Sequence, residues 1–134
     1  MALRKNHRQL VDEANARITT LSLEEAEARR GRPGVVFVDL RDVRELQREG
    51  QIPDAVHAPR GMLEFWVDPD SPYHKPELDP TEHELILYCQ SGWRSALATA
   101  ALVDMGAEHV AHIDGGFSAW KAAGSPVTEP TKRD

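Results

Sequence analysis

The sequence predicts an α/β fold: an open parallel sheet of about five strands with helices on both faces, preceded by an extra N-terminal helix. Short, continuous apolar runs recur along the chain, and such runs are typical of strands that are buried on both faces of a parallel sheet. Segments with helical periodicity lie between these runs, and this alternation favours parallel pairing. The length of 134 residues suits one domain with a single hydrophobic core.

Local signals set the first elements. Residues 4–16 place apolar side chains on one side of a helix and charged side chains elsewhere. The β-branched residues of segment 17–21 predict a short edge strand. A capping box formed by Ser22 and Glu25 then predicts a helix that ends near Gly31.

The remaining elements continue this alternation. We expect strands at residues 35–38, 55–58, 85–88 and 109–113, and helices at residues 42–49, 95–105 and 116–122. Residues 61–80 contain four prolines and are long for a connection in a compact domain, so a lid is one interpretation of this segment. The interpretation that we prefer is that Phe65, Trp66 and Tyr73 pack the segment against the domain.

Charge and hydropathy exclude several classes of function. The chain has 16 Lys and Arg against 22 Asp and Glu, a formal net charge of −6, so attraction to nucleic acid or to an anionic membrane is not expected. No apolar run approaches the roughly 18 residues that a membrane span requires. The N-terminal segment lacks the apolar core and the cleavage site of a signal peptide, so we expect a cytoplasmic protein.

The one cysteine of the sequence, Cys89, directly follows the predicted buried strand at residues 85–88. In open α/β sheets, ligands bind outside the carboxyl ends of the strands. The next residues, Gln90 to Arg94, form a glycine-containing loop that leads into a helix. Such a loop directs several backbone N–H groups into one concavity, where they hold an anion or a thiolate. We therefore interpret Cys89 as a catalytic nucleophile, with a buried structural cysteine as the alternative.

Four segments, in this order, resemble the rhodanese-like domain family. They are VDLR at residues 38–41 (family strand ending in D-x-R), GQIPDA at 50–55 (G-H-I-P-G-A), CQSGWRS at 89–95 (active-site loop C-x-x-G-x-R-S) and GGFSAWKAAGSPV at 115–127 (G-G-x-x-x-W, then A-G-x-P-V). Gln51 and Asp54 depart from the family pattern. The resemblance covers roughly residues 17–127 and leaves an N-terminal helical extension at residues 1–16 and a polar tail at residues 128–134. We expect the basic extension to pack on the same domain, with a docking helix as the alternative.

The resemblance implies a sulfurtransferase. The Cys89 thiolate would attack the sulfane sulfur of a small anionic donor such as thiosulfate, sulfite would leave, and Cys89 would carry the sulfur as a persulfide. A thiophilic acceptor, either cyanide or a thiol that could belong to a protein, would then take the sulfur. No cofactor is implied, because the sulfur is held covalently. No metal site is expected either, because the histidines lack ligand-like spacing.

We expect the donor to be bound by the loop and by nearby arginines. These residues are Gln90, Ser91, Gly92, Trp93, Arg94, Arg60 and Arg41. A solvated surface arginine is the alternative for Arg60 and Arg41, which follow predicted strand ends. Asp39 and Ser95 are expected to be structural residues close to the site. Trp93 is expected to wall the site, to pack against segment 61–80, or to do both.

Two other functions stay open. Similar folds with phosphatase or arsenate reductase activity use a loop C-x5-R, in which one more residue makes room for a tetrahedral oxyanion. The loop from Cys89 to Arg94 is C-x4-R, which suits a smaller sulfur atom. A non-catalytic interaction module is the third hypothesis, and the presence of Cys89, Gly92 and Arg94 argues against it.

Overall fold

A computed structural model describes residues 2–130 of the chain. Within them, one parallel sheet has the strand order β1-β5-β4-β2-β3. Its strands are β1 (Thr19–Leu21), β2 (Val35–Asp39), β3 (Val56–His57), β4 (Glu84–Tyr88) and β5 (Val110–Ile113). The predicted fold class, an open parallel α/β sheet with an additional N-terminal helix, is confirmed.

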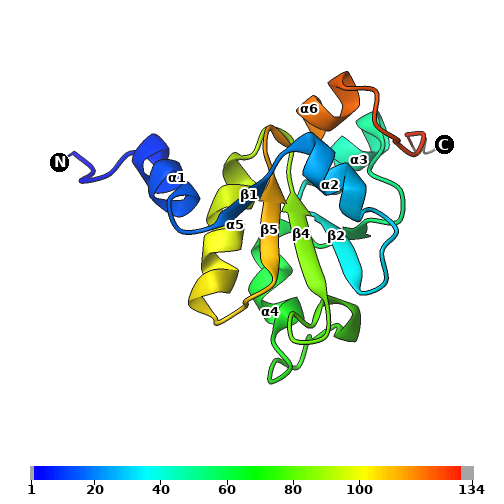
Figure 1. Cartoon of the computed structure of the whole chain (residues 1–134). Helices are drawn as coiled ribbons and strands as arrows, with labels where there is room; N and C mark the ends of the chain where they lie inside the picture. The colour runs from blue at the N-terminus through cyan, green and yellow to red at the C-terminus, as the bar shows by residue number, and fades with distance from the viewer. Residues whose placement is uncertain (1, 131–134) are drawn as a thin grey trace.

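Helices connect the strands and cover both faces of the sheet (Figure 1). The α-helices are α1 (His7–Asn15), α2 (Leu23–Arg29), α3 (Val43–Glu49), α4 (Leu63–Val67), α5 (Trp93–Asp104) and α6 (Gly116–Ala122), and the 3-10 helices are η1 (Arg60–Met62) and η2 (Pro76–Leu78). Successive side chains of a strand point to opposite faces of the sheet. Leu85 and Leu87 of β4 therefore join the core beneath α4 and α5, whereas Ile86 and Tyr88 join the core beneath α2 and α6.

Residues 61–80 fold onto the domain through aliphatic side chains and Trp66, which packs against the core as predicted. Leu63 and Val67, one helical turn apart on α4, are 0% and 1% exposed and belong to the core next to α5. The same helical period turns Phe65 toward solvent. Phe65 and Tyr73 are 54% and 61% exposed, so the expectation that these aromatic residues pack the segment down is wrong for both.

The N-terminal helix α1 packs on the outer side of α5 (Figure 1). Val11 and Ala14 of α1 are buried against Ala96 and Ala100 of α5. Small alanine side chains allow the two helices to approach closely. The packing brings α1 to the flank of the sheet on the side of β1 and β5, where it can reach the end of β5.

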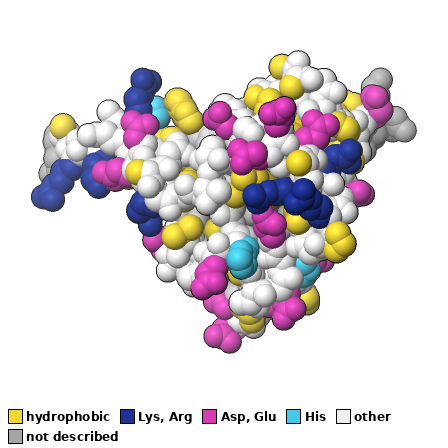
Figure 2. All heavy atoms as spheres, viewed as in Figure 1, with side chains coloured by type: hydrophobic (Ala, Val, Ile, Leu, Met, Phe, Trp, Pro, Cys, Tyr) yellow, Lys and Arg dark blue, Asp and Glu magenta, His cyan; other side chains and the backbone are white. Residues whose placement is uncertain are grey.

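The surface carries both signs of charge. Figure 2 shows acidic and basic side chains interspersed over one face, with several basic ones on the N-terminal segment that projects from it. At the other end of the chain, Thr128 pairs with Gln51, while residues 131–134 of the predicted tail lie outside the described residues. Between residues 2 and 130, no helix has the length and apolar character that a transmembrane helix requires.

Candidate active site

Cys89 lies directly after β4, at the carboxyl edge of the sheet, and is only 1% exposed. Its Sγ accepts hydrogen bonds from the backbone N–H groups of Gly92, at 3.2 Å, and Ser95, at 3.3 Å. Gly92 has a φ of 108°, in the left-handed region that favours glycine, and caps the start of α5. Two N–H dipoles that point at one sulfur at a helix N-terminus stabilise negative charge on it.

The loop after Cys89 is anchored on the first turn of α6. The carbonyl oxygens of Cys89 and Gln90 accept hydrogen bonds from the N–H groups of Phe117, at 2.8 Å, and Ser118, at 3.0 Å. At Gly116, a Cβ atom would lie 2.6 Å from the Cys89 carbonyl oxygen. Only glycine permits this close approach of two backbones, so the position of the loop depends on it.

Arg41 is fully buried and supports the loop that follows Cys89. Its guanidinium donates to Asp39 Oδ2 at 2.7 Å, to the Gly50 carbonyl oxygen at 2.8 Å and to Gln90 Oε1 at 3.1 Å. The Asp39 carboxylate, also 0% exposed, compensates the charge of Arg41. The Arg41 guanidinium is buried and its N–H groups are already bonded to Asp39, Gly50 and Gln90, so the geometry favours a role as a brace over the predicted contact with the donor.

Arg94 forms a two-pronged ion pair with Glu45 of α3, with both N–O distances at 2.9 Å. This carboxylate, and after it the Cys89 thiol, raises the pKa of Arg94, so the guanidinium stays charged beside the sulfur. The Arg94 side chain is 41% exposed and can therefore also face a ligand. Glu45 is a residue of the site that the sequence alone does not reveal. Asp42 and Glu45 form the D-x-x-E pattern of a capping box, which indicates the helix start but not the partner 49 residues away.

Three other residues that are predicted to contact the donor are at least partly exposed. Ser91 and Trp93 are exposed at the loop, and the Trp93 ring lies 5.0 Å from the ring of His7 on α1, centroid to centroid. The neighbour that the structure gives Trp93 is therefore the N-terminal helix. Arg60 lies at the carboxyl edge after β3, and its guanidinium donates to Glu64 at 2.8 Å.

A polar chain runs behind Cys89 into the protein. Cys89 Sγ lies 3.6 Å from Ser95 Oγ, and Ser95 Oγ lies 2.9 Å from Nδ1 of His112. On the far side of the ring, His112 Nε2 lies 3.1 Å from both Asn15 Oδ1 and Thr20 Oγ1. The chain therefore links the thiol to β5, β1 and α1.

His112 is a buried histidine for which the sequence alone indicates no role, because its spacing to the other histidines does not fit a metal site. His112 is 3% exposed, and this burial, which outweighs the opposing effect of Asp114, lowers its pKa and leaves the ring neutral at pH 7. In the parallel register of β4 and β5, His112 lies beside Leu87, two residues before Cys89. No sequence pattern gives this register.

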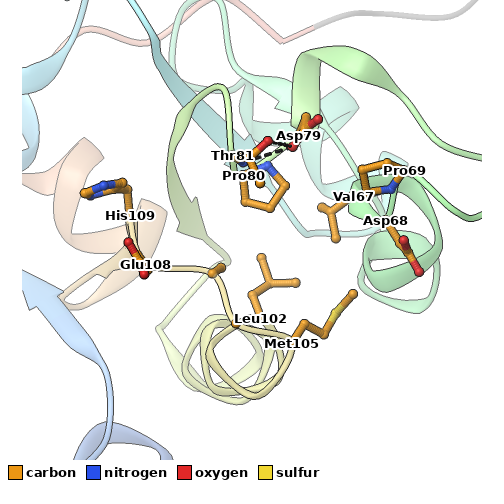
Figure 3. Close-up of a pocket in the computed structure, with 12 residues that line it drawn as sticks. Val67, Asp68, Pro69, Asp79, Pro80, Thr81, Leu102, Met105, Glu108 and His109 are labelled. Atoms are coloured by element: carbon orange, nitrogen blue, oxygen red, sulfur yellow. Dashed lines mark hydrogen bonds between the residues drawn. The ribbon is translucent and has the colours of Figure 1, made fainter.

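The structure offers no metal centre within residues 2–130, where no three His, Cys, Asp or Glu side chains are grouped to hold an ion. It does contain a cavity of about 450 Å³, which lies at the amino edge of the sheet (Figure 3). Figure 3 shows Asp79 and Thr81, which precede β4, on one side and Leu102 and Met105 of α5 on another. Because the five residues of β4 span roughly 16 Å, a ligand in this cavity does not reach Cys89.

Comparison with known proteins identifies relatives along most of the chain. Residues 22–123 match the family model of the rhodanese-like domain. A sulfurtransferase of Allochromatium vinosum is 33% identical over 96 residues, which are 72% of this chain and 80% of that protein. The thiosulfate sulfurtransferase GlpE of Pseudomonas savastanoi pv. phaseolicola is 35% identical over 99 residues, which are 74% and 83% of the two chains.

A solved structure from Rhodopseudomonas palustris CGA009 is similar over almost the whole chain. It has 45% sequence identity and a TM-score of 0.90, and the match covers 96% of this chain and 98% of that one. That protein is described as one of unknown function and a possible tyrosine phosphatase. The relatives therefore carry two different functional descriptions.

Proposed function

This chain belongs to the rhodanese-like domain family, and we propose that it is a sulfurtransferase that carries sulfane sulfur as a persulfide on Cys89. The observation that carries the proposal is the setting of Cys89 Sγ, which accepts two backbone N–H groups at the carboxyl edge of the sheet. Arg94 lies beside it, held in place by its ion pair with Glu45. The sulfurtransferase relatives support a function of this general kind.

The proposed reaction has two displacement steps at sulfur. The Cys89 thiolate attacks the outer sulfur of thiosulfate, a sulfur–sulfur bond forms, and the bond inside thiosulfate breaks, so that sulfite leaves with the electron pair. In the second step, cyanide or an acceptor thiolate attacks the outer sulfur of the persulfide. The bond to Cys89 breaks, and the thiolate is restored. The cycle consumes no cofactor, because Cys89 itself holds the sulfur.

Burial of Cys89 fits small reactants and a carried sulfur. Since Cys89 is 1% exposed, a donor must pass through a narrow opening and present a single atom to Sγ. The outer sulfur of a persulfide stands about 2 Å beyond Sγ, so an acceptor does not need to reach Sγ. The N–H groups of the loop are fixed before reaction, which lets them stabilise the anion without reorganisation.

The test is the intact mass of the protein after incubation with thiosulfate and then with cyanide. We expect the mass to increase by one sulfur atom and to return after cyanide, and we expect no increase in Cys89→Ser. Because the sequence has one cysteine, the added sulfur is assigned without a second variant. Absence of sulfur uptake from thiosulfate, polysulfide and glutathione persulfide alike would refute the proposal.

A phosphatase is the second candidate, favoured by the description of the similar Rhodopseudomonas structure. Loop length opposes it, because C-x4-R is one residue shorter than the loop implied for tetrahedral oxyanions. Hydrolysis of an aryl phosphate by the wild type and by Cys89→Ser separates the two candidates. We expect no hydrolysis that depends on Cys89, and Cys89-dependent turnover without sulfur uptake would establish the phosphatase instead.

A further inference from the structure

We propose that His112 is a positioning residue of the active site, which accepts a proton through Ser95 when the Cys89 thiol ionises. The inference rests on the proposed function in one respect, the need for a thiolate at Cys89. Its geometric basis is the polar chain behind the sulfur, which the two displacement steps do not use. His112 touches neither donor nor acceptor and acts only through Ser95.

Ser95 Oγ is placed to relay a proton. It lies 2.9 Å from His112 Nδ1, 3.3 Å from the Gly92 carbonyl oxygen and 3.6 Å from Cys89 Sγ. A hydroxyl has one proton to donate and two lone pairs that accept. The Gly92 carbonyl oxygen and His112 Nδ1 are the two acceptors for that one proton, and the shorter contact favours His112. Ser95 can then accept from the thiol while it donates to His112.

The groups around His112 determine which ring nitrogen can accept a proton from Ser95. Asn15 Oδ1, 3.1 Å from Nε2, is a carbonyl oxygen that only accepts hydrogen bonds. In the neutral ring one nitrogen carries the proton, and Asn15 places it on Nε2. Nδ1 then keeps a free lone pair that points at Ser95.

The proposed transfer balances without any further reactant. The S–H bond of Cys89 breaks and its proton binds Ser95 Oγ, while the former hydroxyl proton of Ser95 binds Nδ1 of His112. The products are a thiolate, an intact hydroxyl that now donates to Sγ, and an imidazolium. Nε2–H stays on Asn15 Oδ1 throughout.

The surroundings of His112 favour the imidazolium only when Cys89 is a thiolate. The side chains that reach the ring from α1, β1 and α5 are the uncharged Asn15, Thr20 and Ser95. Asp114, directly after β5, is the charged group that acts on the ring. Burial lowers the pKa of His112 and opposes an isolated imidazolium. A thiolate and an imidazolium together carry no net charge, so the two groups titrate as a coupled pair.

The N-terminal extension thereby takes part in the site. Asn15 is the last residue of α1, and it reaches His112 across 97 positions of the chain. The packing of Val11 and Ala14 on α5 holds α1 at this place. An orientation of His112 that suits the thiol thus depends on a helix outside the family match, which begins at residue 22.

The test is the rate of Cys89 alkylation by iodoacetamide as a function of pH, followed by intact mass. Alkylation reports on this thiol alone and needs no sulfur donor, because the sequence has one cysteine. For His112→Gln we expect the midpoint of the profile to rise by about one pH unit, which is about a tenfold lower rate at pH 7. Ser95→Ala should give a similar shift, and the double variant should show no larger shift than the single ones.

Two further variants complete the test. His109→Gln makes the same chemical change at an exposed position before β5 and should leave the midpoint where it is. Asn15→Ala changes an exposed residue and leaves His112 and Ser95 in place, so it tests the relay even if His112→Gln folds poorly. We expect Asn15→Ala to shift the midpoint in the same direction by a smaller amount.

A midpoint for folded His112→Gln or Asn15→Ala equal to that of His109→Gln would overturn the inference, as would additive shifts in the double variant. Sulfur uptake by the wild type is measured separately. A shifted midpoint without sulfur uptake would retain the relay and reject the sulfurtransferase. Sulfur uptake with an unshifted midpoint would retain the sulfurtransferase and reject the relay.

Discussion

Two ion pairs, one at each edge of the sheet, differ strongly in burial. At the carboxyl edge, the ion pair of Arg41 with Asp39 is 0% exposed and its guanidinium also bonds the active-site loop. At the amino edge, the ion pair of Arg29 with Glu84 is about a third exposed, and a cavity of about 450 Å³ opens nearby, before β4 and β5. Electrostatic interactions act more strongly where water is excluded. Cys89 lies at the edge that holds the fully buried pair, next to the loop that this pair braces.

The largest expected difference between the edges is in stability. Arg41→Met leaves the buried Asp39 carboxylate without its partner, and breaking a buried pair costs about 3–5 kcal/mol. Arg29→Met breaks a partly exposed pair, for which we expect a loss of less than about 1 kcal/mol. Urea unfolding of both variants measures the two losses. Equal losses would remove the distinction between the edges.

A pair of glycines tests how closely the loop is held. Gly116 and Gly106 both have positive φ, so alanine carries a conformational cost at each. At Gly116 the new Cβ also meets the Cys89 carbonyl oxygen at 2.6 Å, whereas at Gly106 it meets nothing within 4 Å.

We expect Gly116→Ala to lose roughly 1–3 kcal/mol more stability than Gly106→Ala. Because the clash displaces the loop, we also expect Gly116→Ala to lose most of its sulfur uptake, which intact mass measures. Retained uptake in Gly116→Ala would show that the loop does not depend on this backbone approach.

The ion pair of Glu45 with Arg94 gives the carboxyl edge a pH dependence. Arg94 holds the pKa of Glu45 below its ordinary value of 4.5, so the pair stabilises the fold above that value and is lost as pH falls through the lower, folded pKa. Glu45→Gln keeps an acceptor for the Asp42 N–H but removes the charge. We expect a loss of about 1 kcal/mol at pH 7 that becomes smaller as the pH falls below 4.5 and through the lower, folded pKa. A series of unfolding measurements from pH 7 downward tests this, and a loss independent of pH would assign the effect to helix capping.

The smallest effect is expected in the cavity at the amino edge. Met105 lines it and is 47% exposed, so Met105→Ala should change the free energy of unfolding by less than about 0.5 kcal/mol. Sulfur uptake and the alkylation midpoint of Cys89 should equal those of the wild type. If Met105→Ala abolished sulfur uptake, the cavity would take part in the reaction, and the two edges would not differ in function.

Local sequence was sufficient for much of the fold. The apolar run at residues 85–88 and the capping box of Ser22 and Glu25 correspond to β4 and to the start of α2, because strand burial and helix capping depend on neighbouring residues. No local pattern predicts α4, because its five residues lie among prolines and are helical only in contact with the core. Asp54, one of the two departures from the family pattern, adopts a φ of 66°, which aspartate tolerates better than most residues.

The sequence by itself determined the order of strands and helices and the place of Cys89 at a strand end before a glycine-containing loop. The tertiary structure decided what surrounds the sulfur. It buried Arg41 as a brace, paired Arg94 with Glu45 across 49 positions, and brought His112 behind Ser95. These contacts depend on the parallel register of β4 with β5 and on the packing of helices, which no local pattern of residues specifies.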